Sequence, residues 1–105
     1  MTPLEAFNKI EKIMSKINIP FMDMGEDDTK YDMPLCKVKY YQVEEDHHFQ
    51  IFCFGTTKKE CDDLRFTAAD TISDHGFHVS TNYPYSNPYQ LQKNIWESRI
   101  NVKFN

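Results

Sequence analysis

The sequence has 105 residues, the length of one domain, and 40% of them are hydrophobic, which is enough for a single core. The net charge of −4, with dispersed lysines and arginines, argues against a nucleic-acid-binding face. The three cysteines contain no C-x-x-C pair, unlike a secreted disulfide framework. We see no signal peptide and no apolar run near the roughly 20 residues of a membrane span, so we expect one cytosolic domain, residues 1–105.

The N-terminal segment predicts an amphipathic helix. Thr2 and Glu5 have the T-x-x-E spacing of a capping box. Apolar residues then recur every three or four positions as far as Ile17 and form one stripe. Pro20 disfavours helical geometry in the residue before it, so we expect the helix to stop there and residues 19–22 to form a short strand.

The middle of the chain predicts an antiparallel hairpin. Apolar and polar residues alternate over residues 35–43, which is typical of a strand with one buried face. Residues 44–48 are polar and are expected to form the turn. Residues 49–54 return as a strand that is apolar on both faces, with Phe52 and Phe54 on the face opposite the other apolar residues.

The second half predicts a helix followed by two strands. Thr57 and Glu60 form a second capping-box pattern, and apolar spacing predicts a helix over residues 58–75. Alternation predicts a long strand over 77–83 and a last strand over 95–104. We therefore expect an α+β fold, in the order α-β-β-β-α-β-β, with an antiparallel four- to five-stranded sheet and both helices packed on one face.

Metal binding is the first chemistry to consider, because the chain contains four histidines and three cysteines. Structural zinc sites use closely paired ligands, and these residues are instead scattered over a turn, a helix end and separate strands. We assign no metal site and no cofactor. The residues considered are His47, His48, His75, His78, Cys36, Cys53 and Cys61.

Nucleophilic and acid–base catalysis have equally weak support. Cys61 lies near the start of a helix, where the dipole can activate a thiol, but its spacing also suits a core position. The acidic runs at 27–28, 44–46 and 62–63 fall in loops or in a first helical turn, and negative charge is favourable in a first helical turn in any case. We predict no catalytic residues and no enzyme.

Aromatic and acidic residues provide the candidate contact surfaces. Tyrosine is enriched at protein interfaces, and the segment 83–89 contains three. The two outward phenylalanines require either a cover within the chain or another subunit. The acidic loop at 26–32 is expected to order on contact with a partner. The predicted interface residues are Phe52, Phe54, Tyr83, Tyr85, Tyr89, Glu26, Asp27 and Asp28.

The layout resembles the small tail-terminator, or neck, proteins of long-tailed bacteriophages, including those called minor capsid proteins. The matching features are the first helix ending in Ile17-Asn18-Ile19-Pro20, the acidic loop leading to Met33-Pro34-Leu35, and the strand 49–54. The helix after Gly55-Thr56-Thr57, the His75-Gly76-Phe77 start of the next strand and the closing strand 96–104 also match.

The resemblance implies a virion structural protein that forms a homo-oligomeric ring, typically a hexamer. Such a ring caps the tail tube and docks to the head connector, so the implied partners are the tail-tube protein, head-connector proteins and the chain itself. The implied location is the virion tail or neck, after assembly in the host cytoplasm. We expect no membrane and no direct sequence-specific nucleic-acid contact. The alternatives are a small protein- or peptide-binding module, or a metal- or thiol-dependent enzyme using Cys61.

Overall fold

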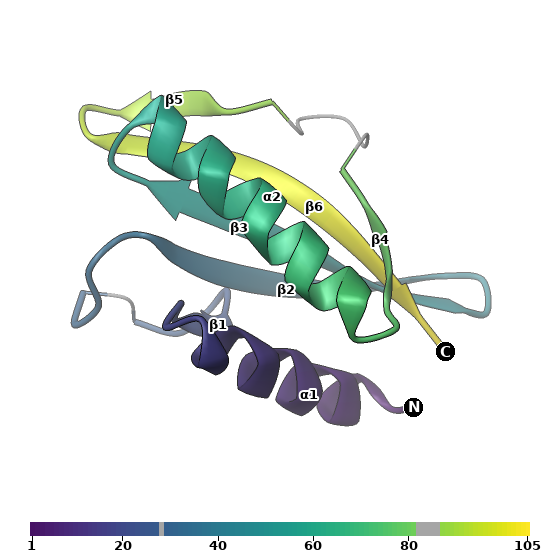
Figure 1. Ribbon diagram of the computed structural model, residues 1–105. Helices are drawn as coiled ribbons and strands as arrows, with labels where there is room; N and C mark the ends of the chain where they lie inside the picture. Colours follow the sequence, from purple (N-terminus) through teal and green to yellow (C-terminus); the bar gives the residue numbers. More distant parts are fainter. Residues whose placement is uncertain (28, 82–86) are drawn as a thin grey trace.

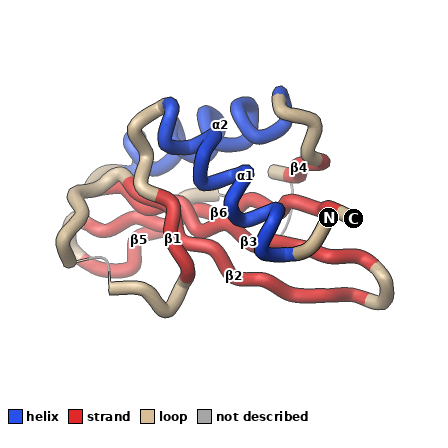
Figure 2. Tube along the Cα trace, turned by 90° about the horizontal axis from the view of Figure 1, so that it is seen from below, coloured by secondary structure: helices blue, strands red, loops and turns tan. Residues whose placement is uncertain are grey.

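The computed structural model describes residues 1–27, 29–81 and 87–105, which form two helices and six strands. Figure 1 shows the strands side by side, and Figure 2 shows both helices on the same face of the sheet. The expected α+β class, with two helices on one face, is confirmed. The elements are α1 (Pro3–Lys16), β1 (Phe21–Asp23), β2 (Leu35–Val43), β3 (Asp46–Gly55), α2 (Lys58–Asp74), β4 (His78–Ser80), β5 (Tyr89–Gln92) and β6 (Ile95–Phe104).

Helix α1 begins with the predicted capping box. The Thr2 hydroxyl accepts the backbone N–H of Glu5 at 3.1 Å, and the Glu5 carboxylate accepts the backbone N–H of Thr2 at the same distance. The helix is followed by Asn18 at φ 59°, a left-handed conformation that asparagine tolerates. Ile10, Ile13 and Met14 of the predicted stripe are buried, together with Ala6, whereas Leu4 at its start is exposed.

The strands are ordered β1-β2-β3-β6-β4, and β5 also pairs with β6. Four of the five strand pairs among the described residues are antiparallel, but β1 pairs parallel to β2, with Phe21 beside Cys36 and Asp23 beside Val38. The expectation of a purely antiparallel sheet is therefore wrong at this edge. Residues 24–34 carry the chain back to the end of the sheet where β1 began, and a crossover of about a dozen residues allows a parallel pair.

The hairpin turn between β2 and β3 is shorter than predicted. Strand β3 begins at Asp46, so the turn consists of Glu44 and Glu45, with Glu44 at φ 55°. His47 and His48, which were expected in the turn, pair with Gln42 and Tyr41 of β2 instead. Ladder hydrogen bonds come from the backbone, so polar side chains near a turn do not prevent pairing.

The two faces of the sheet differ as the alternation predicted. Phe49, Ile51 and Cys53 of β3 belong to the core beneath the helices. The opposite face, which we call the open face, carries the β3 side chains at 48, 50, 52 and 54 and their cross-strand neighbours on β2 and β6. The main cluster of buried apolar residues therefore lies between the sheet and the helix layer, while Met22, Leu35 and Phe52 are buried on the open face.

Helix α2 matches the predicted span to within one residue. The Thr57 hydroxyl accepts the backbone N–H of Glu60 at 3.0 Å. The Glu60 carboxylate does not complete the box but accepts the N–H and the hydroxyl of Thr56, at 2.8 and 3.1 Å. The helix ends at the cap residue His75, followed by Gly76 at φ 92°, where a side chain would be strained.

Strands β4 and β5 are where the sequence prediction was least accurate. The expected strand 77–83 is realised as His78–Ser80, and Tyr83 lies outside the described residues. Strand β5 was not predicted. It is joined to β6 by a two-residue turn, Lys93-Asn94, in which Asn94 has φ 64°. Asparagine in a two-residue connection is a hairpin signal that was available in the sequence.

Candidate interaction surfaces

Phe52 and Phe54 lie on the open face, but neither forms an uncovered patch. Phe52 is 7% exposed. Its ring lies beneath Arg99, whose guanidinium carbon is 4.6 Å from the ring centroid. Phe54 is half-buried. A guanidinium over an aromatic face is a favourable contact, so Phe52 is covered by its own chain.

Arg99 links a small polar cluster across β5 and β6. Its guanidinium donates to the Tyr89 hydroxyl at 3.0 Å and to the Glu97 carboxylate at 3.3 Å. Burial raises the pKa of the Glu97 carboxyl, and Arg99 opposes that rise. The predicted interface residues Phe52 and Tyr89 therefore meet through Arg99, a contact that arises because Phe52 pairs with Arg99 across the strands.

A second polar cluster occupies the hairpin end of the open face. The rings of Tyr41 and His48 stack with centroids 4.9 Å apart. The Tyr41 hydroxyl donates to the Asn101 side-chain oxygen, and the Asn101 amide nitrogen lies 3.1 Å from the His48 ring nitrogen. The hairpin end of the open face is therefore a polar surface with organised side chains, suited to hydrogen-bonded contacts.

The acidic loop presents two of its predicted residues to solvent. Glu26 and Asp27 are exposed. The Asp27 carboxylate accepts the backbone N–H of Thr29 at 3.0 Å, and this bond lowers the pKa of Asp27. Three of the predicted interface residues, Asp28, Tyr83 and Tyr85, lie outside the described residues.

An apolar groove opens on the helix-covered side, at the edge of the sheet. It has a volume of about 380 Å³ and lies between the start of α1 and strands β1 to β3. Leu4 is 68% exposed and Tyr40 is 39% exposed beside it. We call this surface the edge groove; it is lined by Pro3, Leu4, Phe7, Asp23, Val38, Tyr40 and Phe49.

Aromatic rings form the wall of the edge groove toward the hairpin. The Tyr40 hydroxyl lies 2.6 Å from the His47 ring nitrogen, and the two rings stack with centroids 5.8 Å apart. Phe104 packs against Phe49 with centroids 4.7 Å apart. The sequence analysis missed this surface, although it included Leu4 at the start of the first apolar stripe and Tyr40 within the predicted strand 35–43.

The edge of β2 is only partly covered. Strand β1 ends opposite Val38, and in the described part of the chain no strand pairs with the following residues of β2 on the side away from β3. The Cys36 N–H donates to the Pro20 carbonyl at 2.8 Å and the Val38 carbonyl accepts from Met24 at 3.0 Å, so both residues direct their backbone groups to this edge. The side to which the backbone N–H and C=O of a residue point alternates along a strand. Tyr40 and Gln42 therefore also point these groups away from β3, toward the uncovered edge.

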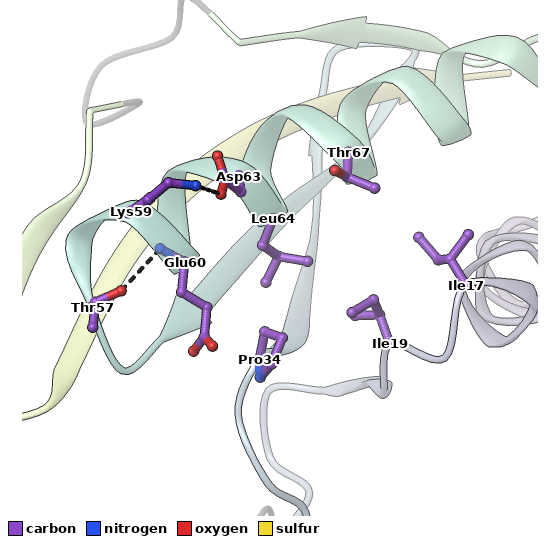
Figure 3. Close-up of a pocket in the computed structure, with 9 residues that line it drawn as sticks. All are labelled: Ile17, Ile19, Pro34, Thr57, Lys59, Glu60, Asp63, Leu64 and Thr67. Carbon is purple, nitrogen blue, oxygen red and sulfur yellow. Dashed lines mark hydrogen bonds and ion pairs between the residues drawn. The ribbon is translucent and has the colours of Figure 1, made fainter.

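A second recess lies between the chain after α1 and the first turns of α2, with a volume of about 390 Å³. Figure 3 shows Leu64 and Glu60 of α2 directed toward Pro34 and Ile19, with Lys59 and Asp63 at the rim on the other side of the helix. Lys59 Nζ lies 2.6 Å from the Asp63 carboxylate, which raises the pKa of Lys59. The rim charges are therefore engaged within α2, and the recess offers chiefly an apolar floor of Ile17, Ile19, Pro34 and Leu64.

The three cysteines gather in the core. Cys36 and Cys53 are cross-strand neighbours with sulfurs 3.9 Å apart. The Cys61 sulfur lies within hydrogen-bonding distance of the Cys53 carbonyl and the Ser98 hydroxyl, each at 3.3 Å. Burial raises the pKa of Cys61 to about 11, so it is protonated at neutral pH, the opposite of an activated nucleophile.

The histidines occupy four separate positions. His47 lies on the helix-covered side and His48 on the open face, while His75 follows α2 and His78 begins β4. Among the described residues, no three His, Cys, Asp or Glu side chains gather as a set of metal ligands. Within the same residues, no helix combines the length and apolarity needed to cross a bilayer. Comparisons with known protein families, curated proteins and solved structures found no match.

Proposed function

We propose that this chain is a non-enzymatic structural subunit that assembles with copies of itself into a ring. The observation that carries the proposal is the edge groove, which lies directly beside the uncovered edge of β2. An apolar surface next to outward-facing backbone groups is the arrangement to which another chain adds a strand. Burial of Leu4 and Tyr40 in such a contact would remove apolar surface from water.

The resemblance in layout supplies the specific setting of the proposal, a tail-terminator or neck ring of a long-tailed bacteriophage. In that setting the ring, typically of six copies, caps the tail tube and docks to the head connector in the virion. The open face and the acidic loop with Glu26 and Asp27 remain outside the edge groove. They are the surfaces that we assign to the tube and connector proteins.

Light scattering coupled to size-exclusion chromatography tests the proposal. The wild-type chain is expected to elute as an oligomer of fixed mass at micromolar concentrations, and Leu4→Asp is expected to reduce that mass. Leu4 is 68% exposed, so the substitution should leave the fold of each subunit intact, and circular dichroism provides the control. A wild-type protein that remains monomeric, alone and with a tail-tube protein, would refute the proposal.

A further inference from the structure

The uncovered edge of β2 and strand β4 lie on opposite edges of the sheet, at the same position along the direction of the strands. Val79 of β4 pairs with Val102 of β6, which pairs with Phe49 of β3. Phe49 pairs in turn with Tyr40 of β2. These four residues form one row across the sheet, and within residues 1–27, 29–81 and 87–105 the row ends at an edge on both sides.

The two edge strands also have the directions needed for pairing. Strand β4 is antiparallel to β6, β6 is antiparallel to β3, and β3 is antiparallel to β2. Strands β4 and β2 therefore point in opposite directions. A second copy placed beside the first in the same orientation would bring β4 against β2 as an antiparallel pair, continuing the pattern of the sheet.

Ring closure constrains the register of such a pair. Copies related by rotation alone have no shift along the ring axis, whereas a shift produces an open helix. Strands that run along that axis therefore meet their neighbours at equal height. We propose that β4 of each copy adds antiparallel to the edge of β2 in the next copy, with Val79 beside Tyr40. This inference rests on the proposed function and names the contact that closes the ring.

The side chains at this contact are compatible with the pairing. Val79 projects to the helix-covered side of its own sheet, where it packs partly against the core. In the pair it would project toward the edge groove of the neighbour, whose Leu4 and Tyr40 are exposed. On the open face, Ser80 would lie beside Lys39, because Ser80, Asn101, Gln50 and Lys39 form the adjacent row.

Gln42→Pro tests the role of the β2 edge. In the proposed register Gln42 lies opposite Phe77, the residue before β4. The N–H of Gln42 points away from β3, so proline removes an outward donor at the end of the contact without breaking the β2–β3 ladder. Gln42→Thr is the matched control, because it removes the same amide side chain and retains the N–H. We expect Gln42→Pro to raise the concentration needed for assembly at least about tenfold, and Gln42→Thr to leave it within about twofold. Unchanged thermal unfolding of the subunit would show that the fold is retained.

Lys39→Cys combined with Ser80→Cys tests the partner strand and its register. Within one copy these positions are separated by β3 and β6, about 14 Å at the usual strand spacing, too far for an internal disulfide. Between copies they would be cross-strand neighbours, and mild oxidation is expected to give a ladder of covalent oligomers. Lys58→Cys with Ser80→Cys is the control, because Lys58 lies on α2 and is expected to give none.

The two claims fail in different ways. A wild-type chain that does not assemble overturns the proposed function and this inference together. A wild-type chain that assembles, while Gln42→Pro assembles equally well and the Lys39/Ser80 cysteine pair gives no covalent ladder, overturns the inference alone.

Discussion

Gly55→Ala tests the packing that places α2 against the sheet. Gly55 is the last residue of β3, and a Cβ added there would lie 2.6 Å from the backbone nitrogen of Cys61. The same Cβ would lie 3.0 Å from the Cys61 Cα and 3.1 Å from the Glu60 carbonyl carbon. All three atoms belong to the backbone of α2, so no side chain can rotate away and the helix itself must shift.

The expected loss of stability follows from that geometry. Overpacking of a core site costs about 1–3 kcal/mol, and a clash with backbone belongs at the upper end, about 3 kcal/mol. Alanine also restricts the unfolded chain more than glycine does, which stabilises the folded state by up to about 1 kcal/mol. The net loss for Gly55→Ala is therefore about 2 kcal/mol, which lowers the Tm of a domain of this size by about 10 °C.

Urea unfolding followed by circular dichroism measures this loss, at one protein concentration for all variants. The matched control is Gly25→Ala, whose added Cβ would make only an ordinary contact, 3.6 Å from the Asp23 carboxylate. Gly25→Ala is expected to change the free energy of unfolding by less than about 0.5 kcal/mol. If Gly55→Ala is as stable as wild type, the close approach of β3 and α2 described above is wrong.

Three further predictions concern the open face, the cap of α2 and the buried thiols. Burial raises the pKa of Glu97 in the folded protein. The protonated carboxyl therefore favours the folded state below the ordinary glutamate pKa, and this contribution to stability is lost as pH rises through the raised pKa of the folded state. Glu97→Gln should therefore gain stability relative to wild type as pH rises from 4 to 7 in urea titrations, and a constant difference would contradict this. Thr57→Ala removes the acceptor for the Glu60 N–H and should cost about 1 kcal/mol in the same assay, whereas a neutral effect would argue against the cap. Cys61, with its pKa of about 11, should resist iodoacetamide at pH 8 in the native protein and react in urea, as mass spectrometry can show; prompt native labelling would contradict its burial.

Local signals in the sequence predicted the helices and most of the strands. Both Thr-x-x-Glu patterns mark real helix starts, and the apolar spacing of α1 identifies its buried stripe. Alternation placed Phe52 on the open face and gave the bounds of β2 and β6. These features depend on residues close together in the chain, and sequence patterns report on such neighbours directly.

The surfaces depend on contacts between distant residues, and the sequence does not specify those. Phe52 is covered because β3 lies beside β6 in a register that pairs it with Arg99. The edge groove exists because β1 pairs parallel to β2 and stops opposite Val38, which leaves Tyr40 at an uncovered edge. Strand order and register therefore decide which aromatic residues are exposed, and the alternation pattern alone pointed to Phe52 and Phe54 instead.

Native mass spectrometry of the wild-type chain over a range of concentrations tests the central claim, self-assembly into a closed ring, most directly. We expect one dominant species whose mass is a fixed multiple of the 12.5 kDa subunit, with no continuing series of larger species, because a ring leaves no free edge. A spectrum that contains only the 12.5 kDa monomer at concentrations up to about 100 µM, or an open-ended series of multiples, would contradict the account.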